Sequence, residues 1–165
     1  MRLLARLLPA LLLTLTLTLT LATQPAAPAK PSRAIPLPNG GTVLLGGRVT
    51  VRVEVAVTDE EQTRGLSGRP GLRPGTGMLF AYPAPAFRSM WMLGMRFPLD
   101  FLWIREGRIV DVFEDVPPPL SGQAPRTVAS QEPAQYILEV PAGFIRTHRL
   151  RRGDPAEVRL DRKSP

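Results

Sequence analysis

Two acidic residues lie in segments that otherwise have the composition of a protein core. Asp100 belongs to MWMLGMRFPLDFLWI, residues 90–104, and Glu139 belongs to AQYILEV, residues 134–140. A carboxylate that is buried without a partner destabilises a fold by several kcal/mol. Each acid must therefore have hydrogen-bond donors or a cationic partner, or it must titrate within a functional site.

Arginine is the expected partner of Asp100, because its planar guanidinium matches a carboxylate. Arg64 and Arg69 lie in the glycine-rich segment RGLSGR, at the end of a predicted short helix and in the loop after it. Both faces of the Asp100 strand are apolar, so the carboxylate should be buried. We predict that it pairs with an arginine of this loop, Arg64 first, with backbone N–H groups of the loop as alternative donors.

Two interpretations of this pairing remain open. In the structural one, Asp100 clamps the loop onto the sheet. In the functional one, a few polar groups and apolar walls form a small-ligand site, as is typical of such sites. The candidate ligand-binding residues are Asp100, Arg64, Arg69, Trp91, Met92, Met95 and Glu139. Asp100 and Glu139 could also act as an acid–base pair of the glycosidase type if their carboxyls faced one cavity, about 5 to 10 Å apart.

Other kinds of chemistry have little support in the sequence. His148 is the single histidine, and it lies among four arginines in RTHRLRR, which indicates a solvated surface. Because the chain also lacks cysteine, a zinc site is not expected, and neither is another metal or a cofactor. No aromatic residue interrupts the basic cluster, so nucleic acid is not the expected partner despite the net charge of +7.

Short strands must position these residues. The strict alternation of VTVRVEVAV, residues 49–57, predicts a half-buried strand, and the capping-box spacing of Thr58 and Glu61 predicts a helix over 59–66. Further strands are predicted over 77–82, 87–95, 99–105, 108–116, 134–140 and 156–160. We therefore expect a mainly β domain, a curved antiparallel sheet closing toward a barrel, with one or two short helices.

The amino-terminal region predicts export. Arg2 and Arg6 precede an apolar run that ends near Ala22, which is the layout of a cleaved secretory signal over residues 1–22. A Pro/Ala-rich linker should follow over 23–41, then a single domain over 42–160 and a tail over 161–165. An uncleaved leader is the alternative, and it would anchor the protein in the membrane. In either case the domain is expected outside the cytoplasm, in the periplasm or secreted.

The motifs also resemble those of one protein family. RGLSGR, GMLF, WMLGMRFPLDFLWI, LEVPAG and RRGD, in this order, are similar to the family called domain of unknown function 192. The resemblance spans residues 49–160 and implies a compact β-rich fold of a small bacterial and archaeal domain that often follows a signal peptide. It implies no activity, because none is established for the family.

Three functions are compatible with these observations. We expect a non-catalytic extracytoplasmic binding or accessory domain, whose partner is a small ligand or an envelope protein. One alternative is an enzyme that acts on a small polar or sugar-like substrate through the Asp100–Glu139 pair. The other is a purely structural envelope protein.

Overall fold

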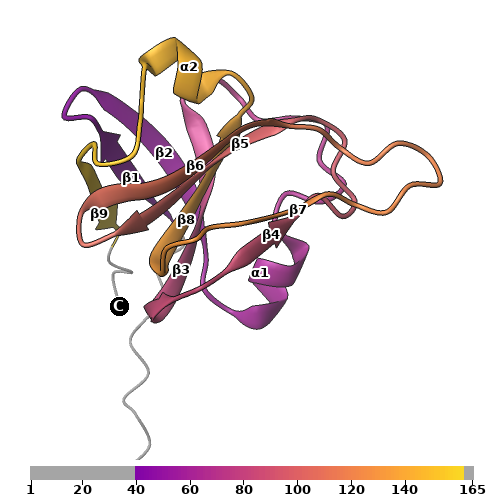
Figure 1. Ribbon diagram of the computed structural model, residues 1–165, viewed down its shortest axis with the longest axis horizontal. Helices are drawn as coiled ribbons and strands as arrows, with labels where there is room; N and C mark the ends of the chain where they lie inside the picture. Colours follow the sequence, from indigo (N-terminus) through magenta and orange to yellow (C-terminus); the bar gives the residue numbers. More distant parts are fainter. Residues whose placement is uncertain (1–39, 162–165) are drawn as a thin grey trace, which may run out of the picture. The chain divides into compact units, whose positions relative to one another are not determined.

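The computed structural model describes residues 40–161, which form one curled sheet with a small second sheet and two short helices (Figure 1). The predicted leader, most of the predicted linker and the tail after residue 161 lie outside the described residues. In chain order the elements are β1 (Gly40–Leu45), β2 (Val49–Ala56), α1 (Asp59–Arg64), β3 (Thr76–Ala86), β4 (Ser89–Trp91), β5 (Leu99–Arg105), β6 (Arg108–Val116), β7 (Thr127–Ala129), β8 (Ala134–Pro141), α2 (Phe144–His148) and β9 (Ala156–Leu160).

The main sheet has seven strands in the order β6-β5-β8-β3-β2-β1-β9, and β4 pairs with β7 in the second sheet. All strand pairs are antiparallel except β2 with β3, which run parallel with α1 in the connection between them. Parallel neighbours need such a crossover, because a tight hairpin can join only antiparallel strands. The prediction of a mainly β fold is confirmed, while this parallel pair was not foreseen.

The two edge strands of the main sheet meet at one end. The N–H of Ile109 donates to the carbonyl of Asp154 at 2.9 Å, and the N–H of Ala156 donates to the carbonyl of Gly107 at 2.8 Å. These bonds join the β5–β6 turn to the start of β9, so the sheet curls into a half-barrel. The predicted closure toward a barrel is therefore confirmed.

The curled sheet has a buried layer on each face. Along β5, Leu102 and Ile104 face the inside of the half-barrel, in a group that we call the barrel core. Phe101 and Trp103 face the other way, into a group that we call the outer core. Because both faces are buried, β5 has the continuous apolar sequence that is typical of such strands.

The outer core is covered by α1, by the β4–β7 ribbon and by the loops beside them.

Two of the elements in this covering layer are shorter than the sequence predicted. The strand predicted over 87–95 is only Ser89–Trp91, because Met92 to Met95 form a turn with Gly94 at φ 70°. The helix predicted over 59–66 ends at Arg64, since Gly65 leaves the helix with φ 47°.

The predicted capping box at the start of α1 is present. The N–H of Glu61 donates to Oγ1 of Thr58 at 3.2 Å, and the N–H of Thr58 donates to the carboxylate of Glu61 at 3.1 Å. This reciprocal pair satisfies donors that a helix start leaves free. Within residues 40–161, neither helix is long and apolar enough to cross a membrane.

Candidate functional site

Asp100 lies on β5 and faces the barrel core, fully buried. Its Oδ1 accepts a hydrogen bond from the N–H of Asp115 at 2.8 Å, and its Oδ2 accepts one from the N–H of Ile145, also at 2.8 Å. Ile145 is the second residue of α2, so the carboxylate satisfies an N–H at the start of that helix. Asp100 therefore ties the end of β6 and the start of α2 to the sheet.

The predicted pairing of Asp100 with Arg64 or Arg69 is wrong. Arg64 is exposed and its nearest acid is Glu60, at 3.8 Å. Arg69 makes a two-pronged pair with Glu54, at 2.6 and 2.7 Å. Both arginines lie with α1 on the outer side of the sheet, whereas Asp100 points into the half-barrel, so the sheet itself separates them. Asp100 is a clamp, but one made with backbone donors.

The alternative considered from the sequence, an acid–base pair of Asp100 and Glu139, does not form. Across the β5–β8 pairing, Asp100 lies opposite Val140, and Phe101 lies opposite Glu139. Directly opposed residues project from the same face of a sheet, and successive residues project from opposite faces. The two carboxyls therefore point to different sides of the sheet, Asp100 inward and Glu139 outward, and cannot face one cavity.

Glu139 is the buried acid of the outer core, with 4% of its surface exposed. Its nearest cross-strand neighbours are Met78 on β3 and Phe101 on β5, both apolar. Within residues 40–161 its Oε2 atom is buried without a hydrogen-bond partner. Burial raises the pKa of Glu139 to about 8, although the nearby charge of Arg69 acts in the opposite direction. At neutral pH the side chain is therefore a neutral acid that can donate a hydrogen bond.

A cavity of about 20 Å³ lies against Glu139, between the sheet and the segments that cover it. We call it the Glu139 cavity. Besides Glu139, its walls include three other candidates from the sequence: Arg64, Trp91 and Met95. The remaining candidates lie elsewhere, since Met92 is buried within the outer core and Arg69 pairs with Glu54. The structure thus brings together four of the seven predicted residues.

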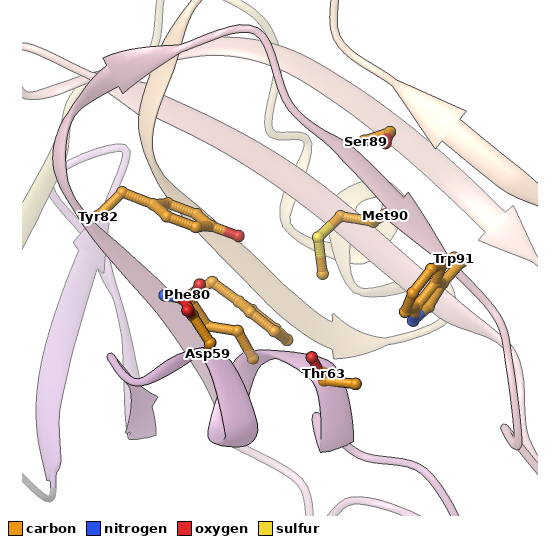
Figure 2. A pocket seen from close by; sticks show the side chains of 8 residues that line it. Asp59, Thr63, Phe80, Tyr82, Ser89, Met90 and Trp91 are labelled. Carbon is orange, nitrogen blue, oxygen red and sulfur yellow. The ribbon is translucent and has the colours of Figure 1, made fainter.

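A wider pocket of about 280 Å³ adjoins this cavity, and we call it the aromatic pocket. Figure 2 shows residues of β3 and β4 facing α1 across it, with the hydroxyl of Tyr82 directed toward Met90. Its lining residues are Asp59, Gln62, Thr63, Phe80, Tyr82, Ser89, Met90 and Trp91. Five of these also line the Glu139 cavity, so the two spaces are neighbours that share a wall.

The chemistry of the aromatic pocket is mixed. Half of the Trp91 side chain is exposed at its rim, where an aromatic ring can cover a bound molecule. The guanidinium of Arg88 lies over the ring of Tyr82, 3.4 Å from its centroid. Burial raises the pKa of Tyr82, so its hydroxyl stays protonated at neutral pH. The pocket therefore offers apolar walls, the hydroxyl groups of Thr63, Tyr82 and Ser89, and one exposed acid, Asp59.

The sequence did not point to most of these pocket residues. Phe80 and Tyr82 alternate on β3, and this spacing was the one signal that they share a face. Met90 lies in a long apolar run that gives it no distinguishing signal. Gln62 and Thr63 lie in a helix that was predicted from its capping box alone. Nothing in the sequence placed that helix opposite β4.

Another pocket, of about 470 Å³, lies near α2 and the start of β2. Its walls are mainly apolar and include Leu72, Phe144 and His148. His148 was expected to be solvated, but it is half-buried, with its ring 4.4 Å from that of Phe144. The buried polar atoms without partners in residues 40–161 belong to Arg88, Trp103 and Glu139, and none of these residues lines this pocket.

Over the described residues, no three acidic or histidine side chains converge as metal ligands would. The donor set of the aromatic pocket agrees with this, since the acids there are Asp59 in the pocket and Glu139 in the neighbouring cavity.

Comparison with known proteins places the chain in a family. Residues 42–158 match the family described as DUF192, uncharacterized ACR. A crystal structure from Sinorhizobium meliloti 1021, provisionally described as a transcription regulator, is 31% identical, with a TM-score of 0.66 over 73% of this chain and 95% of that one. A protein of unknown function from Novosphingobium aromaticivorans DSM 12444 is 27% identical, with a TM-score of 0.63 over 70% and 83% of the two chains. No curated protein matches the chain.

Proposed function

This chain belongs to the DUF192 family of uncharacterized proteins, and on that premise we propose that it is an exported protein that binds a small ligand without catalysis. The ligand occupies the aromatic pocket and reaches the Glu139 cavity. The proposal rests on one observation: the buried Oε2 of Glu139 has no partner within the described residues, and Glu139 lines a cavity that shares five lining residues with the aromatic pocket.

An unpartnered buried polar atom is unusual in a folded protein, because folding removes its water without replacing the hydrogen bond. Ionisable side chains whose pKa is strongly shifted by burial also cluster at functional sites. The surroundings of Glu139 fit a ligand, since one wall is aromatic and a few polar groups converge on the same space. In the barrel core, by contrast, Asp100 already has both of its donors.

The proposal leaves out catalysis because the acid–base pair considered from the sequence, Asp100 with Glu139, is divided between the two faces of the sheet. A glycosidase-type mechanism needs two carboxyls on one substrate. Asp100 lies on the other face of the sheet, and the single histidine, His148, lines a different pocket. Glu139 is thus left to bind a ligand.

Export is proposed from the basic and apolar leader over residues 1–22. The expected partner is not a nucleic acid, although the Sinorhizobium relative carries a regulatory description. Near α2, Arg146 pairs with Asp115 and Glu114, and Arg152 lies within 4 Å of Asp111 and Glu132. Arginines neutralised in this way are poor ligands for a phosphate backbone, which supports the proposal.

The proposal that a ligand binds in the aromatic pocket is tested by filling the pocket with a large side chain. Thr63 is an exposed residue of α1 that lines both the pocket and the cavity, so Thr63→Trp should block them. Thr147→Trp is the matched control, because Thr147 is an exposed threonine on α2 that lines the other pocket. Native mass spectrometry of protein purified from its own host should find a small molecule on the wild type and on Thr147→Trp. The same molecule should be missing from Thr63→Trp, and equal loading of both variants would contradict the proposal.

Export is tested separately. Protein recovered from the native host should begin near Thr23 and fractionate outside the cytoplasm, as intact-mass measurement can show. A full-length chain found in the cytosol would contradict this part of the proposal.

A further inference from the structure

We propose that Glu139 recognises its ligand as a neutral hydrogen-bond donor, and that the ligand is an uncharged molecule with a carbonyl or hydroxyl oxygen at one end and an apolar body. The oxygen enters the Glu139 cavity and the body lies in the aromatic pocket. This inference rests on the proposed function of that pocket and specifies the class of ligand that it takes.

The sizes of the two spaces favour this class. About 20 Å³ admits a group of roughly the size of one water molecule, such as a single oxygen. The adjoining 280 Å³ takes a body of a few carbon atoms or one ring. Phe80, Met90 and Trp91 line both spaces and supply the apolar contact between them.

The charges around Glu139 disfavour a cationic ligand. Arg64 on α1 lines the cavity, and the charge of Arg69, on the loop after α1, acts on the Glu139 carboxyl. One face of the Tyr82 ring, where an amine could stack, is already occupied by Arg88. An ammonium group in the cavity would therefore meet a neutral acid that offers it no negative charge.

An anionic ligand is disfavoured for a different reason. Arg69 is held in its two-pronged pair with Glu54, and Arg64 lies near Glu60, so the guanidinium groups are already partnered. The immediate neighbours of Glu139 on the sheet, Met78 and Phe101, are apolar. A charged oxygen would lose its water there without gaining an equivalent partner.

The protonated acid is the binding-competent form, so affinity should depend on pH. The titratable or charged groups near Glu139 are Arg64, Arg69 and Tyr82. The pKa of Arg69 is raised by its hydrogen bonds with Glu54 and that of Tyr82 by burial, so neither of these two groups changes charge between pH 6 and 9. With a Glu139 pKa of about 8, roughly nine-tenths of the acid is ionised at pH 9. The apparent affinity should then fall about tenfold between pH 6 and pH 9.

The experiment uses acetophenone as the probe and the methionine methyl groups as reporters. Met90 and Met95 line the cavity, and Met78 and Met92 belong to the surrounding outer core. In ¹³C-methyl-methionine NMR of the intact domain, acetophenone should shift the Met90 and Met95 signals in a saturable way. Binding should be about tenfold weaker at pH 9 than at pH 6.

Two variants distinguish the effect of the hydrogen-bond donor at position 139 from the effect of the space in the cavity. Glu139→Gln keeps an N–H donor, so it should bind acetophenone with little dependence on pH. Glu139→Met removes the donor and should lose most of the affinity at pH 6. Benzylamine and benzoate have the same ring with opposite charges, and both should bind more weakly than acetophenone at pH 6.

The outcomes distinguish a failure of the neutral-donor inference from a failure of the proposed ligand pocket. Stronger binding of benzylamine or benzoate, or equal affinity of Glu139→Met and wild type for acetophenone, would overturn the neutral-donor inference while leaving a ligand pocket. If none of the three probes shifts Met90 or Met95, and the protein from its own host also carries no molecule, the proposed function of the pocket itself fails.

Discussion

Asp100 and Glu139 lie on neighbouring strands, are almost equally buried and project from opposite faces of one sheet. Asp100 has two backbone donors, and Glu139 has no partner for its Oε2 within the described residues. The difference comes from what covers each face. A buried acid is structural where backbone N–H groups converge on it, and it is free for a ligand where they do not.

The covering segments explain why the donors differ. On the barrel side, α2 presents its first N–H groups toward the sheet, and Asp115 turns its N–H inward with φ 49°. On the outer side, side chains of α1 and β4 and of the loops beside them cover the sheet, and small spaces remain between these separate pieces. We expect ligand binding on the side that is covered less completely.

The largest expected effect is on the stability of the outer side as pH changes. Glu139 has a pKa near 8 in the folded state against 4.5 ordinarily, so folding favours its neutral form. This preference contributes fully to the free energy of unfolding below pH 4.5, and the contribution is lost as pH rises to about 8. At about 1.4 kcal/mol per pH unit, the loss amounts to about 5 kcal/mol. Glu139→Gln should lack this loss, and urea unfolding of both proteins at pH 5, 7 and 9 measures the difference. Parallel pH profiles would show that Glu139 is not held neutral.

The next largest effect should come from the barrel side. Asp100→Ala leaves the N–H groups of Asp115 and Ile145 without acceptors, at about 1–3 kcal/mol for each. We expect a loss of about 3 kcal/mol in the free energy of unfolding, measured with urea at pH 7. Glu139→Leu should be neutral or stabilising under the same conditions, because it removes an acid that has no partner. Equal destabilisation by the two substitutions would remove the contrast between the faces.

The smallest effect concerns the arginine loop. Arg64→Met should change stability little, because the side chain is exposed and its pair with Glu60 is long. Combined with Asp100→Asn, it should give additive losses to within about 0.5 kcal/mol, since the two residues lie on opposite sides of the sheet. Strong non-additivity in this double-mutant cycle would restore the pairing that the structure contradicts.

The fold was largely predictable because its signals are local. Strict alternation from Val49 to Val57 marked β2, and the Thr58–Glu61 box marked α1. The parallel contact of β2 with β3 was not predictable, because periodicity says which face a residue takes but not which strand lies beside it. Gly94 and Pro98 were signals that could have shortened the strand predicted over 87–95.

The candidate site was only partly predictable. Glu139, Trp91, Met95 and Arg64 were singled out as unusual residues, and the fold brings them to one cavity. The partners of Asp100 were missed because its donors are main-chain N–H groups, which every residue other than proline has and which leave no mark in the sequence. Where both faces of a strand are apolar, the sequence also does not show whether an acid on that strand faces the barrel core or the outer core.

The most direct test of the account is the titration of Glu139 itself. The carboxyl carbon of a ¹³C-labelled glutamate can be followed by NMR from pH 4 to 10, with Glu139→Gln to assign the signal. We predict a midpoint near pH 8, which would identify a neutral donor beside the aromatic pocket at physiological pH. A midpoint near 4.5 would mean that the side chain is ionised and solvated or paired, and it would contradict the contrast between the two acids.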